Sequence, residues 1–166
     1  MSNYDIDPRG YVSVEDAKLL FGSWCNFSGT KNQYSEEGKR YFNIIIDDPV
    51  WAEKLNNLGW NVKFRTPRVD RDPDDEGFHY LKVNIKYGSI PRFNPVIWKH
   101  MGNTTQEITE DNIAELDKDS ILGCDLILRP YHYSKDNPDL ISAQLDTMHV
   151  VVENDRFMHK YANLEG

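Results

Sequence analysis

The sequence contains no long apolar run, only two cysteines, and none of the short motifs of familiar enzymes. Because no segment approaches the roughly 20 apolar residues of a membrane-spanning helix, we expect no membrane association. The first residues also lack the basic and apolar regions of a secretory signal peptide. Cys25 and Cys124 lie far apart and outside any CxxC spacing, which favours reduced core residues in a cytoplasmic protein.

The motifs of phosphate, hydrolase and zinc chemistry are missing. No GxxxxGK[ST], GxGxxG or GxSxG segment occurs, and the five histidines form no HExxH or HxxxH pair. A divalent metal ion could use Asp47-Asp48 only if Glu53 or Asp125 lay nearby. The simpler interpretation is that Asp47 ends a strand and Asp48 caps a helix. We expect no cofactor, no metal ion and no catalysis, with a metal-dependent nuclease as the enzyme alternative.

What the sequence does have is aromatic residues and alternating segments. Nine Tyr, seven Phe and four Trp, with eight Pro and ten Gly, indicate a loop-rich, mainly β protein. Apolar and polar residues alternate over 60–65 and 79–87, the period of a strand with one buried face. Further strands are predicted over 18–27, 40–47, 96–100, 121–131 and 140–153, and short helices after Asp48-Pro49 and over 110–118.

These elements predict one domain with an antiparallel, hairpin-connected strand order. We expect a mainly β fold, an antiparallel barrel of the oligonucleotide/oligosaccharide-binding (OB) type with an extra hairpin and two short helices. A β-sandwich is the alternative. Residues 1–11 are expected to form a flexible N-terminal arm, 12–162 the β domain, and 163–166 a flexible C-terminus.

Charge is unevenly distributed along this acidic chain. The formal net charge is −8, yet segment 39–100 carries 11 basic and 8 acidic residues, whereas 101–166 carries 5 and 13. Nucleic-acid affinity comes largely from neutralised phosphates, so the overall charge disfavours uniform non-specific binding. A local basic face on an acidic body remains compatible with nucleic-acid binding.

The alternating segments collect cations and tyrosines on their polar side. One interpretation is an ordinary solvated strand face. The other is a surface that follows a phosphate backbone and stacks bases on exposed aromatic rings. The residues predicted to contact phosphates or bases are Trp24, Tyr34, Lys39, Arg40, Lys63, Arg65, Tyr80, Lys82, Lys86, Arg129 and Tyr131.

Several segments resemble a family of small bacteriophage proteins described as single-stranded DNA-binding. They are NFSG (26–29), GKRYFNIIIDD (38–48), LGWNVK (58–63), LDKDSILGCDLILRPY (116–131) and HVVVENDRFMHKYA (149–162). The resemblance implies an accessory protein of phage replication or recombination with an OB-type barrel, acting in the host bacterial cytoplasm. Its implied partners are single-stranded DNA, phage or host replication proteins, and further copies of itself. It supplies no list of binding residues.

We therefore predict a non-catalytic phage protein that binds single-stranded DNA on a barrel face by base stacking and phosphate contacts. The alternative is an acidic phage protein that inhibits a host factor, such as a defence nuclease, with its acidic C-terminal half mimicking DNA. A DNA binder loses oligonucleotide affinity steeply with salt, whereas an inhibitor ignores oligonucleotides.

Overall fold

The structure is a computed structural model that describes residues 2–31 and 36–153. The strands are β1 (Asn3–Ile6), β2 (Val12–Leu20), β3 (Arg40–Ile46), β4 (Val62–Arg65), β5 (Phe78–Ile85), β6 (Val96–Met101), β7 (Thr104–Ile108), β8 (Ile121–His132) and β9 (Ile141–Val152). The helix α1 spans Pro49–Asn57, and the 3₁₀ segments η1, η2 and η3 span Gly22–Trp24, Pro91–Phe93 and Ile113–Asp117.

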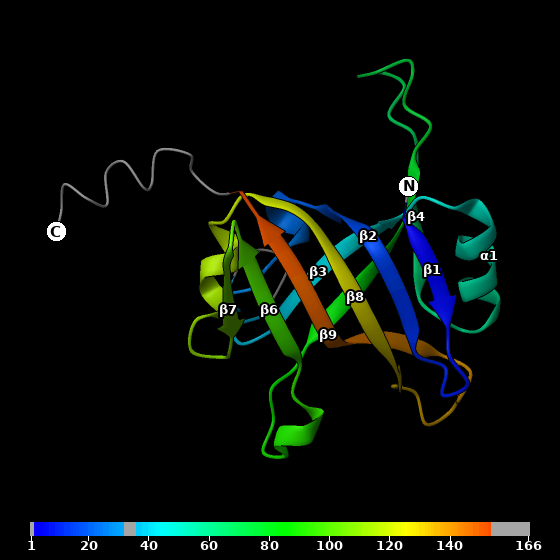
Figure 1. Cartoon of the computed structure of the whole chain (residues 1–166). Helices are drawn as coiled ribbons and strands as arrows, with labels where there is room; N and C mark the ends of the chain where they lie inside the picture. Colours follow the sequence, from blue (N-terminus) through cyan, green and yellow to red (C-terminus); the bar gives the residue numbers. More distant parts are fainter. Residues whose placement is uncertain (1, 32–35, 154–166) are drawn as a thin grey trace, which may run out of the picture.

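Five of the strands close into a barrel (Figure 1). The pairs β2–β3, β3–β5, β2–β8 and β8–β9 are antiparallel, and β5 pairs in parallel with β9. Following the neighbours from β2 through β3, β5, β9 and β8 therefore leads back to β2. The predicted OB-like barrel is confirmed, but its strands are not all antiparallel as expected, because the pair that closes it, β5–β9, is parallel. β6–β7 is the extra hairpin, joined to the barrel through the parallel pair β6–β9.

Alternate residues of the strands fill the barrel interior. On β5, Leu81, Val83 and Ile85 are at most 3% exposed. Because successive side chains of a strand point to opposite faces, the residues between them point outward. These outward residues are Tyr80, Lys82 and Asn84. The alternation predicted for segment 79–87 is therefore confirmed.

The helix after Asp48 is also confirmed. The Asp48 side chain accepts a hydrogen bond from Val50 N at 2.9 Å, as an N-cap does, and Pro49 occupies the first turn. Its buried residues are Ala52 and Leu55. The second predicted helix, over 110–118, is instead the 3₁₀ segment η3. Within the described residues, no helix is both long and apolar enough to cross a membrane.

The N-terminal segment differs from the expected flexible arm. Asn3–Ile6 pair with β2, from Asn3 opposite Glu15 to Ile6 opposite Val12. Asp47 fixes this strand, because it accepts hydrogen bonds from Ser2 N at 3.0 Å and Tyr4 Oη at 2.7 Å. An edge strand can dock through its backbone and a few polar side chains, so its polar composition did not reveal it. The predicted flexible C-terminus, 163–166, lies outside the described residues.

The first long strand begins and ends earlier than predicted. The sequence predicts it over 18–27, but β2 spans Val12–Leu20, and Gly22 takes φ = 72°, a conformation that favours glycine. The chain there turns into η1, so Trp24 and Cys25 leave the sheet. Cys124 lies buried in β8 as expected.

Candidate nucleic-acid interface

The outer surface of three neighbouring strands gathers most of the predicted binding residues. The register places Lys63 of β4 opposite Tyr80 of β5. It places Lys82 of β5 opposite Asn43 of β3. We call this surface the β3–β4–β5 face; its members are Lys39, Tyr41, Asn43, Lys63, Arg65, Phe78, Tyr80, Lys82, Asn84 and Lys86.

An aromatic cluster lies at one end of this face. The Trp24 ring makes edge contacts with Tyr80 at 4.9 Å and with Phe78 at 6.3 Å between ring centroids. The η1 segment is tied to the face because Asn43 Nδ2 donates to Trp24 O at 2.7 Å and Tyr41 Oη donates to Ser23 O at 3.2 Å. Trp24 and Tyr80 are only partly buried.

Four exposed lysines lie along the face. They are Lys39, Lys63, Lys82 and Lys86. Lys39 lies 3.9 Å from the Glu36 carboxylate. Within the described residues, the other three have no carboxylate within ion-pair distance.

The environment of Lys82 shows that positive charge is concentrated here. Partial burial lowers the pKa of Lys82, and the nearby ammonium groups of Lys63 and Lys39 lower it further. Its Nζ lies 4.4 Å from the Tyr41 ring centroid. Like charges that repel one another in the free protein favour the binding of an anion that neutralises them.

A hollow of about 410 Å³ brings four of the predicted cations together. Arg40 lines it from the start of β3, with Lys39 just before that strand, and Lys82 lines it from β5, with Lys86 just after that strand. One carboxylate, that of Glu110, also lines it and lies 3.6 Å from the Arg40 guanidinium. The hollow therefore offers the ammonium groups of Lys82 and Lys86 to a phosphate, while Lys39 and Arg40 each lie near a carboxylate.

The three predicted arginines have acidic partners in the structure. Arg65 Nη2 contacts both oxygens of Asp75, at 2.8 and 2.9 Å. Hydrogen bonds from Arg68 N, Gly77 N and Arg65 lower the pKa of Asp75 to about 2. Arg129 Nη1 lies 3.9 Å from Asp146, and Arg40 is paired with Glu110. Direct phosphate contacts by these arginines remain a prediction; the observed contacts fix loops and strand neighbours.

The face continues sideways from β5 across β9 to β8. Asn84 lies beside Gln144 in the parallel pair, and Gln144 lies opposite Arg129. At the end of β8, Tyr131 is 44% exposed, and Lys86 Nζ lies 5.2 Å from its ring centroid. The described members of the predicted set are thus connected from β4 through β5 and β9 to β8. Tyr34 lies outside the described residues.

The predicted binding set left out four side chains of this face: Tyr41, Asn43, Phe78 and Asn84. Phe78 precedes the segment 79–87 by one residue, and extending the alternation by one step would have found it. Tyr41 and Asn43 alternate with buried residues of β3, so their outward phase was also readable. Tyr41 and Asn43 are each only 5% exposed, because η1 and the Lys82 side chain cover them.

Three of the four carboxylates weighed for a metal site, Asp47, Asp48 and Asp125, have other partners. Asp47 fixes β1, and Asp125 accepts a hydrogen bond from Asp16 N at 2.9 Å. Glu53 is exposed on α1. Over residues 2–31 and 36–153, no three His, Cys, Asp or Glu side chains gather in a way that could hold a metal ion.

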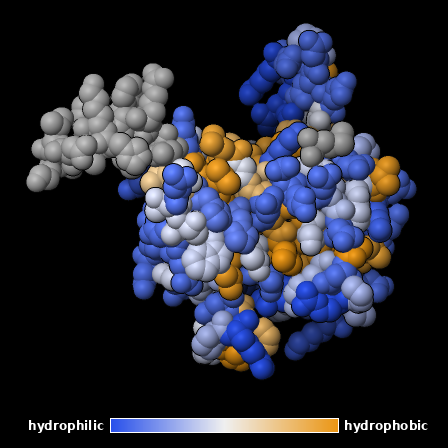
Figure 2. Space-filling model, in the orientation of Figure 1, coloured by the Kyte–Doolittle hydropathy of each residue, from blue (hydrophilic) through white to orange (hydrophobic). Residues whose placement is uncertain are grey.

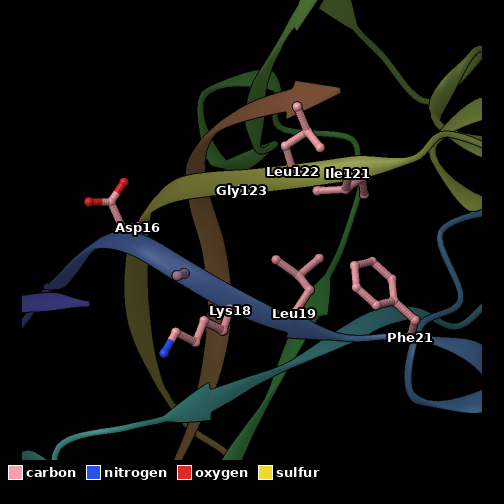
Figure 3. A pocket seen from close by; sticks show the side chains of 8 residues that line it. Asp16, Lys18, Leu19, Phe21, Ile121, Leu122 and Gly123 are labelled. Atoms are coloured by element: carbon pink, nitrogen blue, oxygen red, sulfur yellow. The ribbon is translucent and has the colours of Figure 1, made fainter. Parts of the chain in front are cut away.

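A second hollow lies where β2 and β8 separate (Figure 3). Their pairing reaches Ala17 opposite Cys124 and is not continued toward Phe21 and Leu122, which are 58% and 67% exposed. Figure 2 shows apolar surface at the top of the barrel, near the place where β2 and β8 separate. Lys18, which lines it, lies 3.3 Å from Asp47. This hollow suits a polyanion less well than the β3–β4–β5 face does.

Solved structures of the single-stranded DNA-binding protein from bacteriophage Enc34 share the fold. The structure in complex with single-stranded DNA has a TM-score of 0.56 and 13% identity, and the match covers 95% of this chain and 94% of that chain. A C-terminally truncated form gives 0.55 and 12%, covering 93% and 92%. A third structure gives 0.52 and 14%, covering 95% and 89%.

The sequence itself supports the same relationship. No curated protein matches it. The family described as "Putative phage ssDNA-binding domain" matches residues 1–165, which is nearly the whole chain. The resemblance seen in the sequence segments is therefore confirmed, and this chain belongs to the phage single-stranded DNA-binding domain family.

Proposed function

We propose that this protein binds single-stranded DNA along the β3–β4–β5 face and serves phage DNA replication or recombination without catalysing a reaction. The observation that carries the proposal is the row of Lys63, Lys82 and Lys86, exposed and without carboxylate partners in the described chain, beside the rings of Trp24 and Tyr80. Family membership and the fold shared with a DNA-bound phage protein support it.

The chemistry of the face matches the two parts of a nucleotide. The lysines neutralise phosphates, which releases counterions and favours binding. Trp24 and Tyr80 stack bases, each worth about 1–3 kcal/mol and tolerant of sequence. Outer strand faces and loops are where OB barrels bind oligonucleotides. The proposed setting is the host bacterial cytoplasm, with phage or host replication proteins as further partners.

The test is a fluorescence-anisotropy titration of labelled oligo-dT, about 20 nucleotides long so that it exceeds the usual site of one OB barrel. We expect wild-type binding that weakens as salt rises. We expect Lys82→Glu/Lys86→Glu to weaken binding at low salt by at least about tenfold, because two phosphate contacts are replaced by two repulsive charges.

A charge-matched variant controls for the change in net charge. Lys54→Glu/Lys118→Glu alters exposed lysines of α1 and of the segment after η3, neither of which is a member of the face, and should bind nearly as the wild type does. Equal affinity of all three proteins would refute the proposed face. No wild-type binding even at low salt, together with capture of a host protein, would favour the inhibitor function instead.

A further inference from the structure

The loop between β5 and β6, residues 88–95, projects from the barrel as a fixed unit (Figure 1). Gly88 N donates to Asn94 Oδ1 at 2.8 Å, which joins the two ends of the loop. Within it, Phe93 N donates to Ile90 O at 3.1 Å and Asn94 N to Pro91 O at 3.0 Å. The η2 turn therefore presents its side chains in a set arrangement.

Arg129 holds this loop against the barrel. Its Nη2 donates to Phe93 O at 3.0 Å and to Gln144 Oε1 at 3.2 Å. The Arg129 guanidinium carbon lies 5.6 Å from the Phe93 ring centroid, and that of Arg92 lies 4.8 Å from it. Two guanidinium groups therefore lie near the Phe93 ring, which is still 47% exposed.

The loop adjoins the β3–β4–β5 face. Arg129 lies opposite Gln144, which lies beside Asn84 of that face. Lys86 of the face also contacts the Tyr131 ring, two residues beyond Arg129 on the same strand. A DNA strand that follows β5 past Lys86 would therefore arrive at Phe93.

We propose that Phe93, flanked by Arg92 and Arg129, is a second base-stacking platform for the same DNA strand. This inference rests on the proposed function. An exposed apolar ring alone would fit a protein partner equally well. Here Arg92 is exposed and, within the described residues, has no carboxylate partner, so the site pairs an aromatic face with positive charge. A nucleotide supplies the matching flat base and negative phosphate. Arg129 is a positioning residue that orients the ring and the loop.

The experiment measures oligo-dT affinity of Phe93→Ala by anisotropy, with an oligonucleotide of about 16 nucleotides, the upper site size of one OB barrel. We expect a loss of about fivefold to about a hundredfold, the effect of removing one stacked base. Phe93→Trp should keep or improve affinity, because it preserves the ring. Phe21→Ala is the matched control: Phe21 is also exposed, at 58%, but lies in the gap between β2 and β8, and its loss should leave affinity unchanged.

Photocrosslinking separates this inference from the proposed function. Oligonucleotides with a single 5-iodouracil at successive positions should crosslink to Phe93 from one end of the strand and to Trp24 or Tyr80 from the other. Normal affinity of Phe93→Ala with no crosslink to the loop, while Lys82→Glu/Lys86→Glu still weakens binding, would overturn the platform alone. If neither Phe93→Ala nor Lys82→Glu/Lys86→Glu weakened binding, the proposed face would be overturned as well. A matching loss in Phe21→Ala would show that the effect of Phe93→Ala is not specific.

Discussion

The salt dependence of DNA binding should report how many lysines of the β3–β4–β5 face contact phosphates. The perturbation is Lys82→Gln/Lys86→Gln, which removes two charges and keeps most of each side-chain stem. Both lysines are exposed, and within the described residues neither has a carboxylate partner whose loss would complicate the result. The variant therefore isolates their contribution to phosphate binding.

The expected magnitude follows from counterion release. If Lys39, Lys63, Lys82 and Lys86 each neutralise one phosphate, log K should fall against log salt with a slope of about −2.8, at about 0.7 per phosphate of a single strand. Removing two contacts should reduce the slope to about −1.4. Between about 50 and 200 mM salt, wild-type affinity should then fall about 50-fold and that of the variant about sevenfold.

The assay is anisotropy of labelled oligo-dT over a salt series. Lys54→Gln/Lys118→Gln has the same net charge and should keep the wild-type slope. Folding is checked by thermal unfolding, where the variant should be no less stable, because a lowered Lys82 pKa means that folding disfavours its charge. An unchanged slope in Lys82→Gln/Lys86→Gln would refute phosphate contact by these two lysines.

Three further outcomes are expected. Trp24→Ala should weaken oligo-dT binding by about 1–3 kcal/mol in the same assay, because one stacking ring is lost. Partial burial raises the pKa of Asp47, but hydrogen bonds from Ser2 and Tyr4 and the nearby Lys18 bring it down to about 2. Asp47→Asn should therefore cost about 2 kcal/mol in urea unfolding at pH 7, and the difference should vanish as pH falls from about 4 to about 2; a constant difference would contradict it. Gly59→Ala should cost at least about 3 kcal/mol in thermal unfolding, since its Cβ would overlap the Asp139 carbonyl oxygen and φ is 102°.

Local patterns were enough to predict the central strand and the helix. Side-chain alternation over 79–87 assigned both the buried and the outward residues of β5 correctly. Asp48-Pro49 marked the start of α1, because an N-cap and a proline in the first turn act over only a few residues. Signals of this kind depend on nearest neighbours in sequence, and so they can be read without the fold.

The position of Trp24 shows where local reading failed. It was included as a strand residue, but β2 ends before it, and the turn at Gly22 carries it onto η1. It lies beside Tyr80 because Asn43 and Tyr41, both on β3, donate hydrogen bonds to carbonyl oxygens of η1. The contact between Trp24 and Tyr80 therefore depends on pairing between segments distant in sequence.

The sequence by itself determined the side-chain phase of β5, the helix start, the basic segment and the family, but not the phase of β4, where Phe64 is 48% exposed. Tertiary structure decided which cations remain available. Lys63 and Arg65 share one phase of β4, yet Arg65 is clamped by Asp75 across a loop, whereas Lys63 has no such partner in the described chain. Alternation depends only on the backbone period of two, but charge pairing depends on where loops return and on how β5 meets β9 to close the barrel.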